Sequence, residues 1–219
     1  MIKKTIGVLT IGQSPRTDIV PSFQAILGDD VCIKEAGGLD RLTEQEIANV
    51  YPDEGDTVYI SRLRDGSSVK MGKSKILPLL QKEINELEKE ASIIIVLCTG
   101  ELQALSSNKT MIFPDAILKN IVAATLQLGT LGLIIPLEEQ KEKMLQRWKN
   151  FPVFVEVASP YAKSDVEQAA KKLKEKGASL IVLSCMGYNE RHKEEAIQGS
   201  SLPVLLPKTL IAKIASEYL

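Results

Sequence analysis

The chain has 219 residues, with 27 basic and 28 acidic side chains and a net charge of -1 at pH 7. This balance gives no excess of positive charge to attract nucleic acid or an anionic membrane, and an aromatic content of 5% argues against a base-stacking surface. The length suits one large α/β domain or two lobes of roughly 100 residues each. We therefore expect small molecules, rather than nucleic acid or a membrane, as partners.

The sequence also bears on location. No apolar run approaches the ~20 residues that a membrane span needs. Met1-Ile-Lys-Lys resembles the start of a signal peptide, but the apolar run after it is short and is interrupted at 12–16, so we interpret it as a first strand. The three cysteines are an odd number without a CxxC motif, which is typical neither of a disulfide framework nor of a zinc site. We expect a reduced, cytoplasmic protein.

The first half alternates predicted strands and helices. Apolar runs predict buried strands, and apolar residues at helical spacing predict helices. In chain order these are a strand over 5–11, a helix over 15–28, a strand over 31–35, a hairpin over 57–62 and 67–71, a helix over 74–90 and a strand over 92–97. Asp65-Gly66 is the turn signal of the hairpin. Cys32 falls inside an apolar strand and is interpreted as a core residue, whereas Cys98 comes directly after one.

The second half, from about residue 116, repeats this alternation. Its predicted elements are a strand over 131–135, a charged helix over 137–149, a strand over 152–157, a helix over 165–176, a strand over 179–184, a helix over 190–198, a short strand over 203–206 and an amphipathic helix over 207–219. Cys185 follows the third of these strands. Strands that alternate with helices predict an α/β fold with mainly parallel sheets and helices on both faces.

An internal repeat links the two halves. The segments ASIIIVLCTG (91–100) and ASLIVLSCMG (178–187) align without gaps, 87 positions apart. Any two buried strands look somewhat alike, but these also share a Cys-x-Gly just past the strand, where ligands bind in open α/β sheets. We predict two pseudo-symmetric Rossmann-like lobes, the first enlarged by the hairpin near 56–72, with a small-molecule cleft between them lined by Cys98 and Cys185.

The chemistry of the two cysteines depends on their ionisation. A thiol is a base or nucleophile only as thiolate, and we expect a helix starting just after each of Cys98 and Cys185 to favour that form. One thiolate and one thiol on opposite faces of a carbon acid can exchange a proton with it, as a racemase or isomerase does. The same residues could support nucleophilic addition or a hydrolysis that uses one cysteine.

Polar residues near the strand ends suggest an anionic substrate. The candidate substrate-binding residues are Ser14, Arg16, Thr99, Gly100, Gly187 and Tyr188. Hydroxyls, exposed amides and a guanidinium suit a carboxylate or phosphate. Arg16 could be a ligand or a solvated surface residue, and Tyr188 could donate its hydroxyl or simply pack. Arg62 and Arg64 flank the region and, taken singly, are interpreted as solvated.

Cofactor signals are weak. His192 is the only histidine and lies in a charged segment, which predicts a solvated helix face and excludes a His-based metal cluster. No Ser-His-Asp triad is visible, and Gly7 and Gly12 do not make the GxGxxG motif of a dinucleotide site. We expect neither a cofactor nor a metal.

Five segments together resemble the AroM family over essentially the whole chain. They are TIGQSPRTD (10–18), SRLRDG (61–66), LCTGE (97–101), CMGY (185–188) and LPVLLPKTLIA (202–212). The family name implies an association with aromatic amino-acid biosynthesis genes and no particular reaction.

More distantly, a cysteine after a strand in each of two halves resembles the aspartate/glutamate/hydantoin racemase superfamily. There two cysteines exchange protons with the substrate α-carbon without a cofactor, which implies that Cys98 and Cys185 are catalytic. The layout implies a first lobe of 1–115 plus 207–219 and a second of 116–206. Glutamate racemases carry Cys-Asn-Thr and Cys-Thr-His, whereas this chain has Cys-Thr-Gly at 98–100 and Cys-Met-Gly at 185–187. Glutamate is therefore not implied as the substrate.

Three functions remain open from the sequence. The first is a cofactor-independent isomerase or racemase that acts on a small carboxylate. The second is a lyase or hydrolase that uses one cysteine on the same scaffold, and the third is a small-molecule-binding protein without turnover. The sequence leaves open the substrate and whether the chain forms a homo-oligomer.

Overall fold

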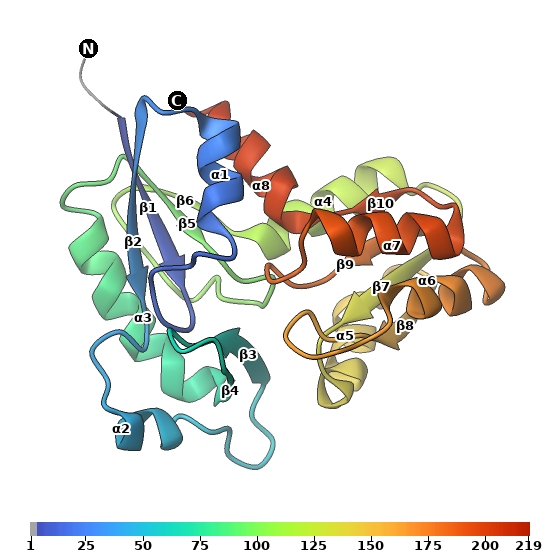
Figure 1. Cartoon of the computed structure of the whole chain (residues 1–219), viewed down its shortest axis with the longest axis horizontal. Coiled ribbons are helices and arrows are strands. Elements are labelled where there is room, and N and C mark those ends of the chain that lie inside the picture. The colour runs from blue at the N-terminus through green and yellow to red at the C-terminus, as the bar shows by residue number, and fades with distance from the viewer. Residues whose placement is uncertain (1–3) are drawn as a thin grey trace. The chain divides into compact units, whose positions relative to one another are not determined.

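The computed structural model describes residues 4–219. The chain folds into two compact units, each with its own four-stranded sheet. Unit 1 comprises Met1–Asp115 and Ile211–Leu219, and unit 2 comprises Ala116–Leu210. The predicted α/β fold with mainly parallel sheets in two lobes is confirmed (Figure 1).

The sheet of unit 1 is wholly parallel. Its order is β2-β1-β5-β6, formed by β1 (Lys4–Thr10), β2 (Val31–Gly37), β5 (Ile93–Val96) and β6 (Thr110–Ile112). The central strand β1 pairs Leu9 with Ala36 on one side and with Val96 on the other. The carboxyl ends of β1 and β5 therefore lie next to each other at one edge of the sheet.

Three helices and a hairpin complete unit 1. They are α1 (Val20–Leu27), α2 (Glu44–Ala48), α3 (Lys73–Leu87) and the antiparallel pair β3 (Val58–Arg62) and β4 (Ser68–Gly72). The predicted hairpin is confirmed, and Gly66 adopts the left-handed φ of +88° that its turn requires. Figure 1 shows the hairpin beyond the carboxyl ends of β1 and β2. The amide of Gln13 donates to the carbonyl of Arg62, which joins the hairpin to the segment after β1.

The sheet of unit 2 is also parallel, in the order β10-β9-β7-β8. Its strands are β7 (Thr130–Ile135), β8 (Val153–Val157), β9 (Ala178–Leu183) and β10 (Val204–Leu205), and its helical elements are α4 (Pro114–Thr125), η1 (Glu138–Gln140), α5 (Lys141–Arg147), α6 (Val166–Glu175) and α7 (Glu190–Ser200). The last helix, α8 (Pro207–Ser216), is divided between the two units. α4 begins at the end of unit 1, and α8 enters unit 1 at Ile211.

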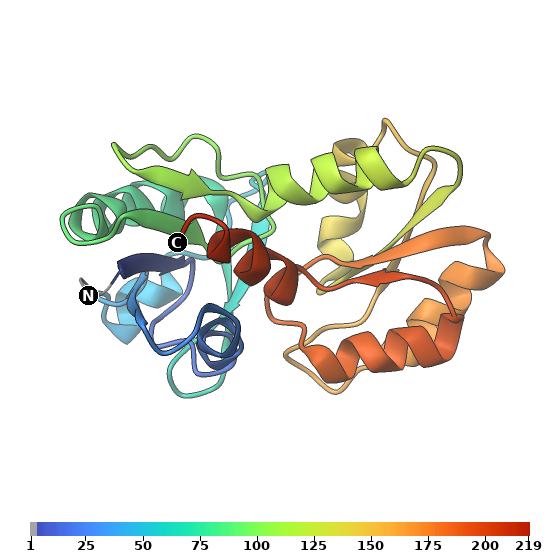
Figure 2. The same cartoon turned by 90° about the horizontal axis from the view of Figure 1, so that it is seen from above.

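Successive residues of β7 pack into two different hydrophobic clusters of unit 2. Ile134 packs in one apolar cluster with α6 and α7, whereas Leu133 and Ile135 pack in another with α4 and α5. This alternation is what a strand with both faces covered requires. Figure 2 accordingly shows α4 and α7 on opposite sides of this sheet.

Some predictions from the sequence are wrong, and some elements of the structure were not predicted. The first helix begins at Val20 and not near residue 15, because 15–19 form a turn in which the carbonyl of Arg16 accepts from the amides of Ile19 and Val20. The elements α2, β6 and α4 were not predicted. Cys32 is exposed rather than part of the core, because β2 is an edge strand and that position is not covered.

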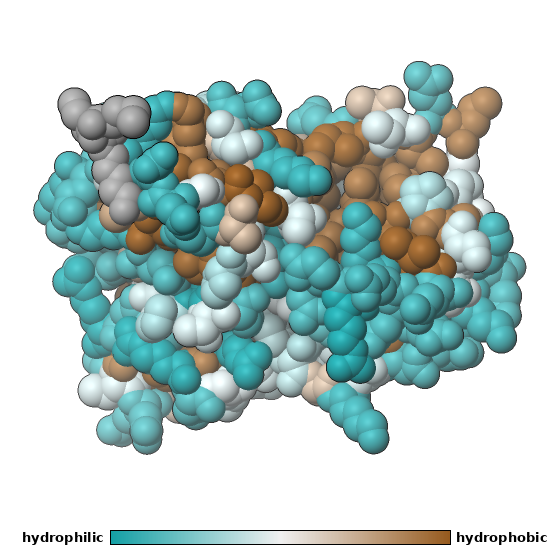
Figure 3. All heavy atoms as spheres, turned by 45° about the horizontal axis from the view of Figure 1, so that its top comes forward, coloured by the Kyte–Doolittle hydropathy of each residue, from teal (hydrophilic) through white to brown (hydrophobic). Residues whose placement is uncertain are grey.

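The outer surface carries both hydrophilic and apolar side chains. Within residues 4–219, no helix is both long and apolar enough to cross a membrane. Figure 3 shows hydrophilic side chains over α7 and apolar side chains elsewhere on the same face. The large apolar residues with substantial exposure are Tyr51, Leu128, Leu145, Ile197 and Tyr218.

His192 stabilises the start of α7 and does not lie on a solvated helix face as predicted. It is half-buried, its Nδ1 accepts from the amide of Asn189, and the Asn189 side chain accepts from the His192 amide. The ring also meets Tyr188 edge-on, with centroids 5.5 Å apart. Burial lowers the pKa of His192, an effect partly opposed by Glu195.

We predict that His192→Gln flattens the dependence of stability on pH. The folded state keeps His192 neutral below its ordinary pKa of about 6.5, so the unfolded state takes up the proton first and stability falls as pH drops through that value. Glutamine can complete the same capping box but does not titrate. The measurement is urea unfolding between pH 7.5 and 5.5. Equal slopes for both proteins would contradict this role of His192.

Candidate active site

Cys98 lies in a tight turn at the carboxyl end of β5. The amide of Cys98 donates to the carbonyl of Val96, two residues earlier, at 2.8 Å. The amide of Gly100 donates to the Cys98 sulfur at 3.2 Å. The thiol is 9% exposed, and Thr99 beside it is buried. Leu97 donates to the carbonyl of Leu9, which ties the turn to the end of β1.

Cys185 lies in the same turn at the end of β9. Its amide donates to the carbonyl of Leu183 at 2.8 Å, and the amide of Gly187 donates to its sulfur at 3.4 Å. Ser184 donates to the carbonyl of Ile134, as Leu97 does to Leu9 in unit 1. The internal repeat in the sequence thus corresponds to a repeated backbone geometry that holds a thiol at the end of a central strand.

A tyrosine covers the glycine of each turn. A Cβ on Gly100 would lie 2.4 Å from the Cε1 atom of Tyr59, and a Cβ on Gly187 would lie 2.4 Å from the hydroxyl of Tyr161. Real Cβ atoms do not come so close, so a side chain at either position would require the tyrosine to move. The Tyr161 hydroxyl also lies 3.6 Å from the Cys185 sulfur, at hydrogen-bond distance for sulfur. Neither tyrosine could be predicted from the local sequence around the cysteines, since one comes from β3 and the other from the loop after β8.

The expected helix after Cys98 is wrong, whereas the helix predicted over 190–198, after Cys185, is confirmed as α7. No helix follows Cys98 until Pro114, and α7 begins at Glu190, with Asn189 as its N-cap. The glycine amides, rather than a helix dipole, therefore point at the two sulfurs. A hydrogen bond donated to sulfur stabilises a thiolate more than a thiol.

Ser14 ties the segment after β1 to its neighbours. Its amide and hydroxyl donate to the two carboxylate oxygens of Asp40, at 2.7 and 2.6 Å. Asp40 also accepts from the guanidinium of Arg64, whose Nε donates to the carbonyl of Ser14. These bonds give Ser14 a structural role in joining three segments of unit 1.

Arg16 is buried, not a solvated surface residue, at 3% exposure. Its Nε and Nη2 atoms donate to the two oxygens of Asp18, both at 2.8 Å, and its Nη1 donates to the hydroxyls of Thr10 and Ser61. Burial opposes the ionisation of Asp18, but the hydrogen bonds and charge of Arg16 outweigh it and lower the pKa of that carboxyl. The guanidinium is thus held in place by the protein itself.

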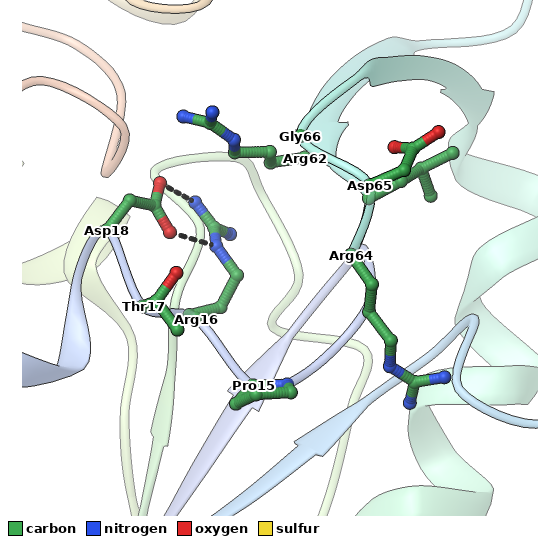
Figure 4. Close-up of a pocket in the computed structure, with 9 residues that line it drawn as sticks. Pro15, Arg16, Thr17, Asp18, Arg62, Arg64, Asp65 and Gly66 are labelled. Carbon is green, nitrogen blue, oxygen red and sulfur yellow. Dashed lines mark hydrogen bonds and ion pairs between the residues drawn. The ribbon is translucent and has the colours of Figure 1, made fainter.

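A pocket of about 470 Å³ opens beside this pair (Figure 4). It is lined by Pro15, Arg16, Thr17, Asp18, Arg62, Leu63, Arg64, Asp65 and Gly66. Of the predicted ligand residues in unit 1 it includes Arg16 but not Ser14, Thr99 or Gly100. The structure does not bring those three into this pocket, because the Ser14 hydroxyl is bound to Asp40 and the Gly100 amide to the Cys98 sulfur.

Tyr188 lies in the core of unit 2, which supports the packing alternative. It is fully buried and its hydroxyl donates to the carbonyl of Ala158 at 2.6 Å. Burial raises the pKa of Tyr188 well above its ordinary value, and the neighbouring Cys185 and Tyr161 raise it further. Its hydroxyl therefore stays protonated. Within residues 4–219, no group of three or more His, Cys, Asp or Glu side chains is placed to hold a metal ion.

Comparison with protein families decides the chain's identity. Residues 6–219 match the family described as "AroM protein". The chain belongs to the AroM family. The predicted resemblance is confirmed, and the Cys-x-Gly turns, the hairpin and the segment after β1 all lie within the matched part of this AroM protein. Comparison with the sequences of curated proteins gives no match.

Solved structures share the fold of this AroM protein at low sequence identity. Glutamate racemase from Francisella tularensis subsp. tularensis SCHU S4, in complex with D-glutamate, has a TM-score of 0.61 and 16% identity over 99% of this chain and 81% of its own. Arylmalonate decarboxylase has a TM-score of 0.60 and 13% identity over 98% and 91%. The maleate isomerase Iso from Pseudomonas putida S16 has a TM-score of 0.54 and 11% identity over 97% and 91%. These likenesses show that the chain shares the fold of these enzymes.

We predict that Gly100→Ala destabilises the protein more than Gly187→Ala. Tyr59 is buried on a strand and cannot yield, so the new methyl overpacks the core at a cost of about 1–3 kcal/mol. Tyr161 is half-buried in a loop and can move aside, which removes its hydroxyl from Cys185. Unfolding free energies and the alkylation rate of Cys185 measure the two effects.

The double variant Tyr161→Ala/Gly187→Ala is the control for the second effect. With the ring gone, the added methyl has nothing to displace, so stability and the alkylation rate should match those of Tyr161→Ala alone. A larger loss of stability for Gly187→Ala than for Gly100→Ala would contradict the steric account.

Proposed function

We propose that the protein is a cofactor-independent isomerase or racemase that acts on a small carboxylate through Cys98 and Cys185. The observation that carries this proposal is the repeated Cys-x-Gly turn, which puts a thiol at the carboxyl end of a central strand in each unit and points an amide at its sulfur. In open α/β sheets that end of the strands is where ligands bind. The shared racemase fold supports the same function class.

The reaction needs one sulfur as thiolate and the other as thiol. The thiolate takes the proton from the carbon next to the substrate carboxylate, and the thiol on the opposite face gives its proton to that carbon. The configuration inverts, no atoms are gained or lost, and the two sulfurs exchange protonation states. Each glycine amide stabilises whichever sulfur carries the charge, so the two turns suit a reaction that runs in both directions.

A difference between the two thiols favours a second candidate, a lyase or hydrolase that uses Cys185 alone. Cys98 is buried, whereas Cys185 is half-buried and has the Tyr161 hydroxyl beside its sulfur. A hydroxyl there can pass a proton to or from the thiol or a bound intermediate. In this case Cys98 would be a relic of the duplication.

The two candidates differ in what each cysteine variant loses. A panel of small carboxylates is first screened by thermal shift, because a ligand stabilises the fold that binds it. For a carboxylate that binds, exchange of its α-hydrogen with deuterium oxide is then followed by NMR. We predict that Cys98→Ser and Cys185→Ser each abolish exchange from one enantiomer and reduce isomerisation by about 10²–10⁴-fold. Cys32→Ser, at an exposed thiol, is the matched control and should leave exchange and isomerisation unchanged.

Full activity in Cys98→Ser together with loss in Cys185→Ser would support the single-cysteine candidate. Full activity in both variants would refute a role for either thiol.

A further inference from the structure

The pocket in unit 1 holds one guanidinium, that of Arg62, whose charge helps to lower the pKa of Asp18 but which forms no close ion pair within the described residues. Its wall carries three arginines and two aspartates, contributed by 15–18 and by the hairpin loop 62–66. Arg16 is paired with Asp18, Arg64 with Asp40, and Asp65 accepts from the amide and hydroxyl of Ser67. The guanidinium of Arg62 makes no hydrogen bond or ion pair with any residue in 4–219.

Arg62 is held over the pocket although its guanidinium has no hydrogen-bond partner there. The residue ends β3 and its side chain is half-buried. Figure 4 shows its guanidinium reaching toward the Arg16–Asp18 pair. Its Nη2 atom lies 3.3 Å from where a Cβ on Gly66 would stand, so the glycine leaves room for it. A guanidinium offers a planar fork of donors that matches a carboxylate, and leaving those donors unused in a partly desolvated site is unfavourable.

The pocket shares a sheet edge with the candidate catalytic thiol of unit 1. Arg16 donates to Thr10, the last residue of β1, and the amide of Leu97 donates to the carbonyl of Leu9 just before it. Cys98 is the next residue after Leu97. A ligand bound in the pocket therefore lies at the carboxyl ends of the same two strands that present the thiol.

We propose that this pocket is the carboxylate subsite and that Arg62 is the residue that binds the carboxylate. Arg16 is a positioning residue, because its donors are committed to Asp18, Thr10 and Ser61. The Asp18 carboxylate on the same wall repels a second anionic group and attracts a hydrogen-bond donor. The pocket thus fits a single carboxylate next to an amino or hydroxyl group, such as an α-amino or α-hydroxy acid, better than a dianion.

The identification of this ligand as the substrate rests on the proposed function, whereas its binding does not. We therefore test binding by calorimetry with alanine, lactate, malonate and inorganic phosphate as probes. Wild-type protein should bind alanine or lactate more tightly than malonate or phosphate. Arg62→Gln should weaken that binding at least about tenfold, as expected for the loss of a charge-assisted pair. Arg62→Lys keeps the charge but not the planar fork of donors, so its affinity should lie between those of the wild type and Arg62→Gln.

Arg191→Gln is the matched control, since Arg191 is an exposed arginine on α7 that pairs with Glu195 in the next turn. It should bind as the wild type does. Cys98→Ser and Cys185→Ser should also bind normally even if they lose exchange, so failure of the proposed reaction is separable from failure of this subsite. Unchanged binding in Arg62→Gln, no binding of any probe to wild type, or a preference for phosphate would overturn the proposal. Melting temperatures confirm that each variant is folded.

Discussion

Both candidate thiols depend on one hydrogen bond, from the amide of a glycine to the sulfur two residues before it. The bond can form only where the chain turns sharply at the end of a strand, and here the cysteine amide closes that turn onto the strand's own carbonyl. In each unit a tyrosine lies against the glycine at the third position of the turn, so a larger residue there would require the ring to move. One local constraint thus fixes the place and the orientation of each sulfur.

The hairpin β3–β4 makes the two halves chemically different. It brings Tyr59 over Gly100, places Ser61 against the guanidinium of Arg16 and holds Arg62 over the pocket. In unit 2 the loop after β8 places Tyr161 against the equivalent glycine, Gly187. The charged pocket described above belongs to unit 1. A repeated scaffold with one insertion therefore combines a thiol in each unit with a single charged pocket, and under the proposed function that pocket would orient an asymmetric small substrate.

Local patterns made much of this predictable from the sequence. The buried strands, the Asp65-Gly66 turn and the two Cys-x-Gly turns are encoded within a few residues each. Exposure of Cys32 depends on which strand lies at the sheet edge, and burial of Arg16 depends on a hydroxyl 45 residues away, so neither could be derived from local patterns. Helix α2 had a usable signal, the Thr43 capping box. That the Arg62 guanidinium is left without a hydrogen-bond partner can be seen only when the ion pairs of the neighbouring arginines are known.

The central claim, that two thiols act on one carbon, is tested most directly by the distance between their sulfurs in the folded protein. Two proton-transfer partners that each approach a carbon to about 3–3.5 Å stand about 7 Å apart. A short bifunctional thiol reagent, applied to the Cys32→Ser protein so that the exposed thiol does not interfere, should join Cys98 to Cys185 in one cross-linked peptide seen by mass spectrometry. A bound carboxylate should block the cross-link. Separate modification of the two cysteines, with no cross-linked peptide under native conditions, would contradict the two-thiol account.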